Sequence, residues 1–273
     1  MNKRIRTVRT NRISRRIAIT LGALLLAACV LSCGSFRINS AAAEGVYVDQ
    51  PIVEDRPIPS LENMEVEDDF AELFEVNNDL VGWLTVGDVV DLPVTQYDNT
   101  YYLDHDFYGK EDQAGTVFIN EANIIWPQDR NLLFHGHNMK SGASFGNLDD
   151  YRELDYLKEY PIVSFRTIYD EDPTVYVPVA LFDASMNADN KDYFDIGRIT
   201  FKTDDEFVAF ANDCIAHSIF QTPFDVKPED TLITLITCSY SNDNGRFMIV
   251  CRALRDDESI LSVSDLMQQA TAK

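Results

Sequence analysis

The chain has 273 residues, of which 45% are hydrophobic, so it is not wholly disordered and has enough apolar side chains for one sizeable core. Its formal net charge of -22 is unevenly divided: the first 43 residues hold eight Lys and Arg and no acid, and all 45 acids follow from Glu44 onward. So acidic a body repels nucleic acid and anionic membrane surfaces, which excludes a nucleic-acid partner and favours basic, neutral or small ligands. A surface that only keeps the protein soluble explains the charge equally well.

Residues 1–43 are typical of a membrane-targeting segment. A basic region ends at Arg16, and the apolar run "IAITLGALLLAACVLSC" then covers residues 17–33, a length between a signal-peptide core and a spanning helix. Three kinds of processing are compatible with this segment: lipoprotein cleavage at "LAAC", signal-peptidase cleavage near "AAAE", or no cleavage, so that it stays as an anchor with its basic end inside. The positive-inside rule favours the uncleaved anchor. All three place the acidic body outside the cytoplasm. The expected location is therefore the cell membrane, crossed once, with the body extracellular.

Residues 44–67 contain prolines and many acids, and they predict an extended spacer. The folded domain is expected at residues 68–273. It opens with a helix over residues 69–76, in which Phe70, Leu73 and Phe74 have helical spacing.

Short segments rich in β-branched and aromatic residues then recur between Gly, Asn, Asp and Pro, which predicts a mostly antiparallel β-barrel or β-sandwich. Further helices are expected over residues 143–160, after Thr203 as N-cap, and near the end of the chain at "SVSDLMQQA". The predicted strands are "LVGWLTV", "DLPVTQY", "AGTVFIN", "RNLLFHG", "PIVSFRTI", "TVYVPVALFDA", "GRITF", "TLITLITC" and "RFMIVCRAL".

Three cysteines belong to the body, and cysteines outside the cytoplasm usually pair. At least one of the three is unpaired unless it bonds another chain, and Cys238 is the candidate nucleophile. It ends the alternating run "TLITLITC", and a short loop then returns the chain at Arg246, so the two residues are expected to lie close across a hairpin. An arginine that pairs with Asp243 on a solvated hairpin explains the same spacing. Cys214 and Cys251 are expected to be core thiols.

Two of the histidines, His135 and His137, have two possible roles in the chemistry of the site. In "LLFHGHNMKSG", His135 and His137 are two residues apart, so in a strand they share one face. They form either a metal site of the H-x-H kind, which needs carboxylates to complete it, or one catalytic histidine with a neighbour. His105 is expected to be charge-paired with the neighbouring aspartates, and His217 to end a helix.

Together these motifs resemble the class B sortases, which are cysteine transpeptidases of Gram-positive cell surfaces. "TLITC" at residues 234–238 fits the T-L-x-T-C signature of that family, and Arg246 fits its arginine. "GHNM" at residues 136–139, followed by "FGNL" at residues 145–148, is similar to the segment that bears its histidine. The preceding stretches "DLVGWLTV", "DNTYYLDHDFYGK" and "AGTVFIN" are also similar.

The resemblance implies a mostly β fold with added helices: an eight-stranded sortase-type β-barrel with N-terminal helices and a helix between strands 6 and 7. It selects His137 over His135, because the family's histidine follows the glycine. The position before Gly136 is often tyrosine in that family, so His135 would put a titratable group beside the substrate.

By the same resemblance, Cys238 is the nucleophile, His137 the general acid and base, and Arg246 the group that holds the developing oxyanion. No metal and no cofactor is implied. The residues implied in substrate binding are Asn99, Leu103, Thr237 and His135.

The implied activity is cleavage of a C-terminal sorting signal resembling N-P-x-T-x in surface proteins, followed by transfer of the acyl group to an amine of a peptidoglycan precursor or a pilin. The implied partners are those proteins, the amine acceptor, and the membrane through the N-terminal segment. Two other functions remain open: a metal-dependent surface hydrolase that uses the H-x-H pair, and a non-catalytic sortase-like binding domain.

Overall fold

The computed structural model describes residues 64–239 and 244–273. The expected signal or anchor segment, residues 1–43, and residues 44–63 of the expected spacer lie outside this part of the chain. Among the described residues, no helix combines the length and the apolar character that crossing a bilayer requires. The helices and strands are α2 (Asp68–Val76), β1 (Leu80–Val86), β2 (Val90–Thr95), η3 (Tyr101–Leu103), β3 (Phe118–Ile119), β4 (Asn131–His135), η4 (Gly146–Arg152), α3 (Leu154–Glu159), β5 (Val163–Thr167), β6 (Thr174–Ser185), α4 (Asp204–His217), β7 (Phe220–Gln221), β8 (Leu232–Ser239), β9 (Gly245–Ala253), α5 (Ile260–Met267) and β10 (Thr271–Ala272).

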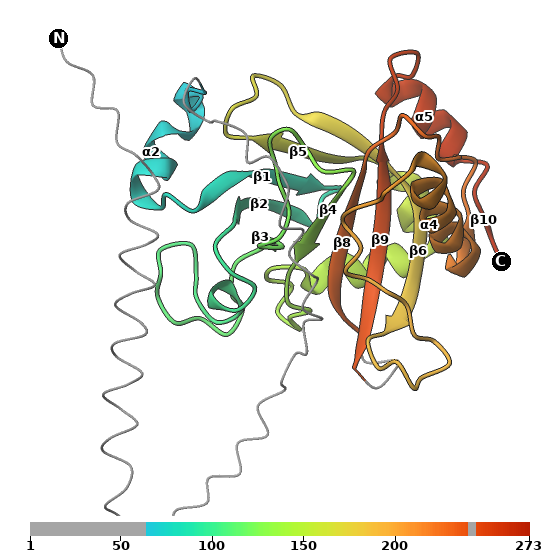
Figure 1. Cartoon of the computed structure of the whole chain (residues 1–273), viewed down its shortest axis with the longest axis horizontal. Coiled ribbons are helices and arrows are strands. Elements are labelled where there is room, and N and C mark those ends of the chain that lie inside the picture. The colour runs from blue at the N-terminus through green and yellow to red at the C-terminus, as the bar shows by residue number, and fades with distance from the viewer. Residues whose placement is uncertain (1–63, 240–243) are drawn as a thin grey trace, which may run out of the picture. The chain divides into compact units, whose positions relative to one another are not determined.

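Eight strands close into a barrel in the order β1-β2-β3-β4-β8-β9-β6-β5, with β5 pairing back onto β1. The expected eight-stranded barrel is therefore confirmed. The expectation of a mostly antiparallel domain is also confirmed, since six of the eight neighbouring strand pairs are antiparallel. The pairs β2–β3 and β4–β8 are parallel, so the barrel is mixed. Figure 1 shows β8 and β9 side by side, with α4, α5 and β10 at one side of the barrel and α2 at the other.

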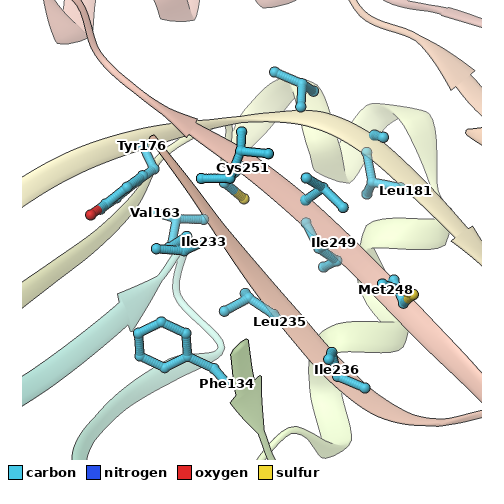
Figure 2. Packing of buried hydrophobic residues seen from close by; sticks show 14 of the residues in the cluster. Phe134, Val163, Tyr176, Leu181, Ile233, Leu235, Ile236, Met248, Ile249 and Cys251 are labelled. Carbon is cyan, nitrogen blue, oxygen red and sulfur yellow. The ribbon is translucent and has the colours of Figure 1, made fainter. Parts of the chain in front are cut away.

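The core fills the space between these strands, because β-branched and aromatic side chains pack well on a pleated surface. Figure 2 shows Phe134, Val163, Ile233 and Leu235, which come from three strands of the barrel, β4, β5 and β8. Each of these four side chains is fully buried, and the ring of Phe134 meets that of Phe165 edge to face at a centroid distance of 4.9 Å. The strands β4 and β8 are thus anchored in the core by buried side chains.

Helix α4 lies between β6 and β8, which are the sixth and seventh barrel strands, as the resemblance implied. Thr203 is its N-cap and accepts a hydrogen bond from the backbone N–H of Glu206, as predicted. The buried face of the helix consists of Phe207, Phe210, Ala211 and Cys214, at the spacing of successive helical turns.

Two sequence-based elements are wrong. Residues 197–201, "GRITF", form no strand; instead Phe201 packs against the rings of Phe207 and Phe210 of α4, so its apolar character serves helix packing. The single helix expected over residues 143–160 is two, η4 and α3, because Glu153 has an extended backbone with φ -93° and ψ 125°.

Candidate active site

Cys238 and Arg246 face each other across the hairpin of β8 and β9. They are direct Cα partners in the antiparallel ladder, so their side chains project to the same side of the sheet. This confirms the hairpin predicted from the sequence. Arg246 donates from Nη1 to the carbonyl oxygen of Gly245 at 2.9 Å, and none of the carboxylates in the described residues forms an ion pair with it. The alternative partner Asp243 lies outside those residues.

His137 reaches Cys238 because β4 and β8 are parallel neighbours. The last ladder pair joins His135 to Ile236, and the N–H of Gly136 donates to the carbonyl oxygen of Ile236 at 3.2 Å. Two residues further along each strand, His137 is therefore at the level of Cys238. The two side chains interact there, and each is the largest cause of the pKa shift of the other.

Two glycines let the loop after β4 fold tightly around His137. A Cβ on Gly136 would lie 2.7 Å from the ring of Phe145, and one on Gly146 would lie 2.0 Å from the carbonyl oxygen of Met139. The N–H of Phe145 donates to the carbonyl oxygen of His137 at 3.0 Å. The "GHNM" and "FGNL" motifs are thus the two sides of one compact loop.

The electrostatics of the site favour a charged thiolate and imidazolium. The hydrogen bond to His137 lowers the pKa of Cys238, and the positive charge of Arg246 adds to this effect, while burial opposes it. The hydrogen bond to Cys238 raises the pKa of His137, and the Leu103 carbonyl adds to this effect, while burial and Arg246 oppose it. Since each partner favours the charged form of the other, the pair is poised for nucleophilic attack.

The carbonyl oxygen of Leu103, in η3, lies 2.7 Å from Nε2 of His137. A carbonyl oxygen can only accept, so Nε2 carries a hydrogen and Nδ1 is the nitrogen that exchanges a proton. The sequence pointed to Leu103 as a substrate contact; in the structure its backbone orients the imidazole.

His135 occupies the end of β4 and is 6% exposed. Its ring stacks on Phe118 at a centroid distance of 5.2 Å. Burial, with a smaller contribution from the charge of Arg246, lowers the pKa of His135 to about 3, so the ring is neutral. The imidazole of His135 therefore contributes aromatic packing to the site and no charge.

Asn99 and Thr237 lie in different surroundings. The side-chain oxygen of Asn99 accepts a hydrogen bond from the N–H of Glu121 at 2.9 Å, which ties the loop before η3 to the loop after β3. Thr237 is 1% exposed and, by strand alternation, points to the face of β8 opposite Cys238. Contacts of either residue with a substrate stay predictions.

The other two body cysteines are core thiols, as expected. Cys214 and Cys251 are unpaired and fully buried, and burial raises the pKa of each. In the part of the chain that the structure describes, no three His, Cys, Asp or Glu side chains form a group that could hold a metal ion.

Asn138 is a site residue that the sequence did not reveal. Its side-chain amide donates to the carbonyl oxygen of Cys238 at 3.0 Å and to Asp149 Oδ2 at 2.9 Å. The signal was present in "GHNM", since Asn138 directly follows His137, but a lone asparagine carries no spacing pattern.

A thiol whose pKa is lowered by an imidazole, with a guanidinium across the hairpin, at one edge of a closed barrel, defines a cysteine-dependent acyl-transfer enzyme. No family model matches the chain. The chain is 32% identical to sortase B of Listeria monocytogenes over 191 residues. This aligned region covers 68% of this chain and 74% of the Listeria protein. The chain therefore belongs to the class B sortases and is a cysteine transpeptidase.

Solved structures agree with this assignment. Sortase B of B. anthracis, in complex with AAEK2, superposes with a TM-score of 0.62 at 26% identity, over 71% of this chain and 86% of that one. A Staphylococcus aureus sortase B–substrate complex has the same fold, with a TM-score of 0.63 at 22% identity, over 72% of this chain and 89% of that one.

Proposed function

We propose that the protein cleaves a sorting signal resembling N-P-x-T-x in surface proteins and transfers the acyl group to an amine of the cell wall or of a pilin. The observation that carries the proposal is the direct pairing of Cys238 with Arg246, together with the lowering of the pKa of Cys238 by His137. This arrangement supplies a nucleophile, a proton carrier and an oxyanion donor at one point.

In the first step the Cys238 thiolate attacks the carbonyl carbon after the threonine of the signal. The C–S bond forms, and the carbonyl oxygen becomes an oxyanion held by the guanidinium of Arg246. The oxyanion then collapses, the C–N bond breaks, and His137 gives its proton to the leaving amine. The product of this step is a thioester on Cys238.

In the second step an acceptor amine attacks the thioester carbonyl. The now neutral His137 takes the proton of the amine, the new C–N bond forms and the C–S bond breaks. Cys238 leaves as the thiolate and His137 is again the imidazolium. The N-terminal segment, residues 1–43, would hold the domain at the outer membrane face, where protein substrate and wall precursor meet.

Arg246→Ala is expected to lower kcat by about 10²- to 10³-fold, the usual cost of losing one oxyanion donor. Steady-state kinetics on a sorting-signal peptide with an amine acceptor measures it. Arg198→Ala is the matched control, because Arg198 is a partly exposed arginine that pairs with Glu206 beside α4, away from the site. An Arg246→Ala enzyme with unchanged kcat and a raised KM would show that Arg246 only binds the substrate.

The direct test of the proposed reaction is a covalent adduct. The full chain, incubated with N-P-x-T-x peptides but without acceptor, should gain the acyl mass on the peptide that contains Cys238, and an added amine should remove it. A thiol alkylator should stop the reaction and a chelator should leave it unchanged. Loss of activity to the chelator alone would favour the metal-dependent hydrolase, and no adduct across a broad panel of signals and amines would favour the binding domain.

A further inference from the structure

A network of polar side chains joins the residue after His137 to the residue after Cys238. It crosses from the loop after β4, through η4 and β6, to the end of β8. The members of this polar network are Asn138, Asp149, Arg152, Asp183 and Ser239.

Asn138 holds the two reacting strands together at one end of the network. Its Nδ2 donates one hydrogen to the carbonyl oxygen of Cys238 at 3.0 Å and the other to Asp149 Oδ2 at 2.9 Å. Both partners can only accept, so the orientation of the amide is fixed. His137 lies beyond the last ladder pair of β4 and β8, so this side-chain contact continues the connection between the strands where the backbone ladder has ended.

Arg152 is the centre of the network. Its Nε donates to Asp149 Oδ1 at 2.8 Å, while Nη1 and Nη2 donate to the two oxygens of Asp183 at 2.6 and 2.8 Å. The guanidinium also lies over the ring of Phe247, 3.9 Å from its centroid. The planar guanidinium thus binds the Asp183 carboxylate through two nitrogens and the Asp149 carboxylate through the third, which fixes its orientation. The single ammonium group of a lysine cannot make these contacts.

Ser239 closes the network directly after Cys238. Its hydroxyl donates to Asp183 Oδ1 at 2.5 Å and accepts from Arg152 Nη2 at 3.3 Å. The backbone on the far side of Cys238 is thereby fixed to the same carboxylate that fixes Arg152.

We propose that the polar network is a positioning device that sets the separation of the His137 imidazole and the Cys238 thiol, with Arg152 as its central positioning residue. The proposal rests on the proposed function in taking these two residues as the reacting pair. No member of the network needs to touch the substrate. Proton exchange between imidazole and thiol requires hydrogen-bond reach, and a displacement of about 1 Å can cost about a hundredfold in rate.

The test measures the ionisation of Cys238 beside His137 in the absence of substrate. Iodoacetamide alkylation of the full chain is followed against pH on the peptide that contains Cys238, by mass spectrometry. Its rate reports the thiolate fraction, which the hydrogen bond to His137 sustains. In Arg152→Gln and Asn138→Ala the alkylation midpoint should rise by about one pH unit. At a pH below the midpoint, the thiolate fraction of Cys238 would then be about tenfold smaller than in the wild type. Arg152→Lys should show an intermediate shift.

Arg255→Gln is the matched control. Arg255 also bridges two carboxylates, with Nη1 3.0 Å from Asp225 Oδ1 and Nη2 2.8 Å from Asp230 Oδ2, but it follows the far end of β9. Its loss should lower the melting temperature and leave the alkylation midpoint in place.

An unchanged midpoint in folded Asn138→Ala would overturn the proposal, as would an equal shift in Arg255→Gln. If Arg152→Gln does not fold, Asn138→Ala still decides the question, because it removes no ion pair. The proposed reaction and the positioning role of the network can fail separately. If the wild type forms the acyl adduct and the network variants keep the wild-type alkylation midpoint, only the positioning role is refuted. Shifted midpoints in a chain that no signal peptide acylates support the network and refute only the proposed reaction.

Discussion

Replacing Cys238 by alanine is expected to lower acyl transfer by about 10⁴-fold or more, because the acyl group then has no thiolate with which to form a thioester. The change removes one partly buried sulfur at the end of β8 and leaves the barrel ladder intact, so the fold should persist. Product formation from a sorting-signal peptide and an amine acceptor measures the loss. The same variant should show no acyl mass when the acceptor is left out.

Cys251→Ala is the control for that experiment. Cys251 is fully buried in β9, opposite Ile233, and burial raises the pKa of its thiol. Its truncation should cost roughly 1 kcal/mol of stability, because the sulfur is about as large as a methylene group. Activity at low temperature should be retained. Residual transfer in Cys238→Ala, or lost transfer in a folded Cys251→Ala, would contradict the assignment of the nucleophile.

The placement of Cys238 and Arg246 could be predicted from sequence because it follows from local geometry. Strand alternation and a short loop are enough to put two residues of one hairpin opposite each other. The cap at Thr203 is likewise a local pattern, and it was predicted, as was the burial of Cys214 in α4.

What the sequence could not supply depends on contacts between distant segments. Periodicity does not tell a parallel pair from an antiparallel one, so the pairing of β4 with β8 was not predicted. That His137 and Cys238 act together was implied only by the resemblance to a family. The polar network had one local signal, since Asp149 and Arg152 are three residues apart and pair on one turn of η4. Nothing local connects that turn with Asp183 in β6 or with Ser239 in β8.

The contacts of Leu103 and Asn138 change the picture of the base. The resemblance implied His137 as the general acid and base, and no group that orients its ring was predicted. In the structure, the Leu103 carbonyl holds a hydrogen on Nε2 at 2.7 Å, while Asn138 ties the next residue to the carbonyl oxygen of Cys238. His137 is therefore held from two sides, and its Nδ1 is the proton carrier for both steps.

His137→Ala is expected to lower kcat/KM by about 10²- to 10⁴-fold, the range usually lost with a general acid–base group. It also removes the hydrogen bond that lowers the pKa of Cys238, so the alkylation midpoint of Cys238 should rise. The sign is fixed by the charge: an imidazolium stabilises the thiolate, and without it more hydroxide is needed to remove the thiol proton. Both the transfer rate near neutral pH and the alkylation profile should therefore change in the same variant.

His135→Ala separates this role from that of a neighbouring ring. His135 is buried, neutral and stacked on Phe118, so its loss should reduce stability and lower activity by less than about tenfold. The alkylation midpoint of Cys238 should stay near that of the wild type, because a neutral ring contributes no charge to the thiolate. If His135→Ala abolished transfer while His137→Ala retained it, the base would be His135, and the parallel register of β4 and β8 would serve to place that residue instead.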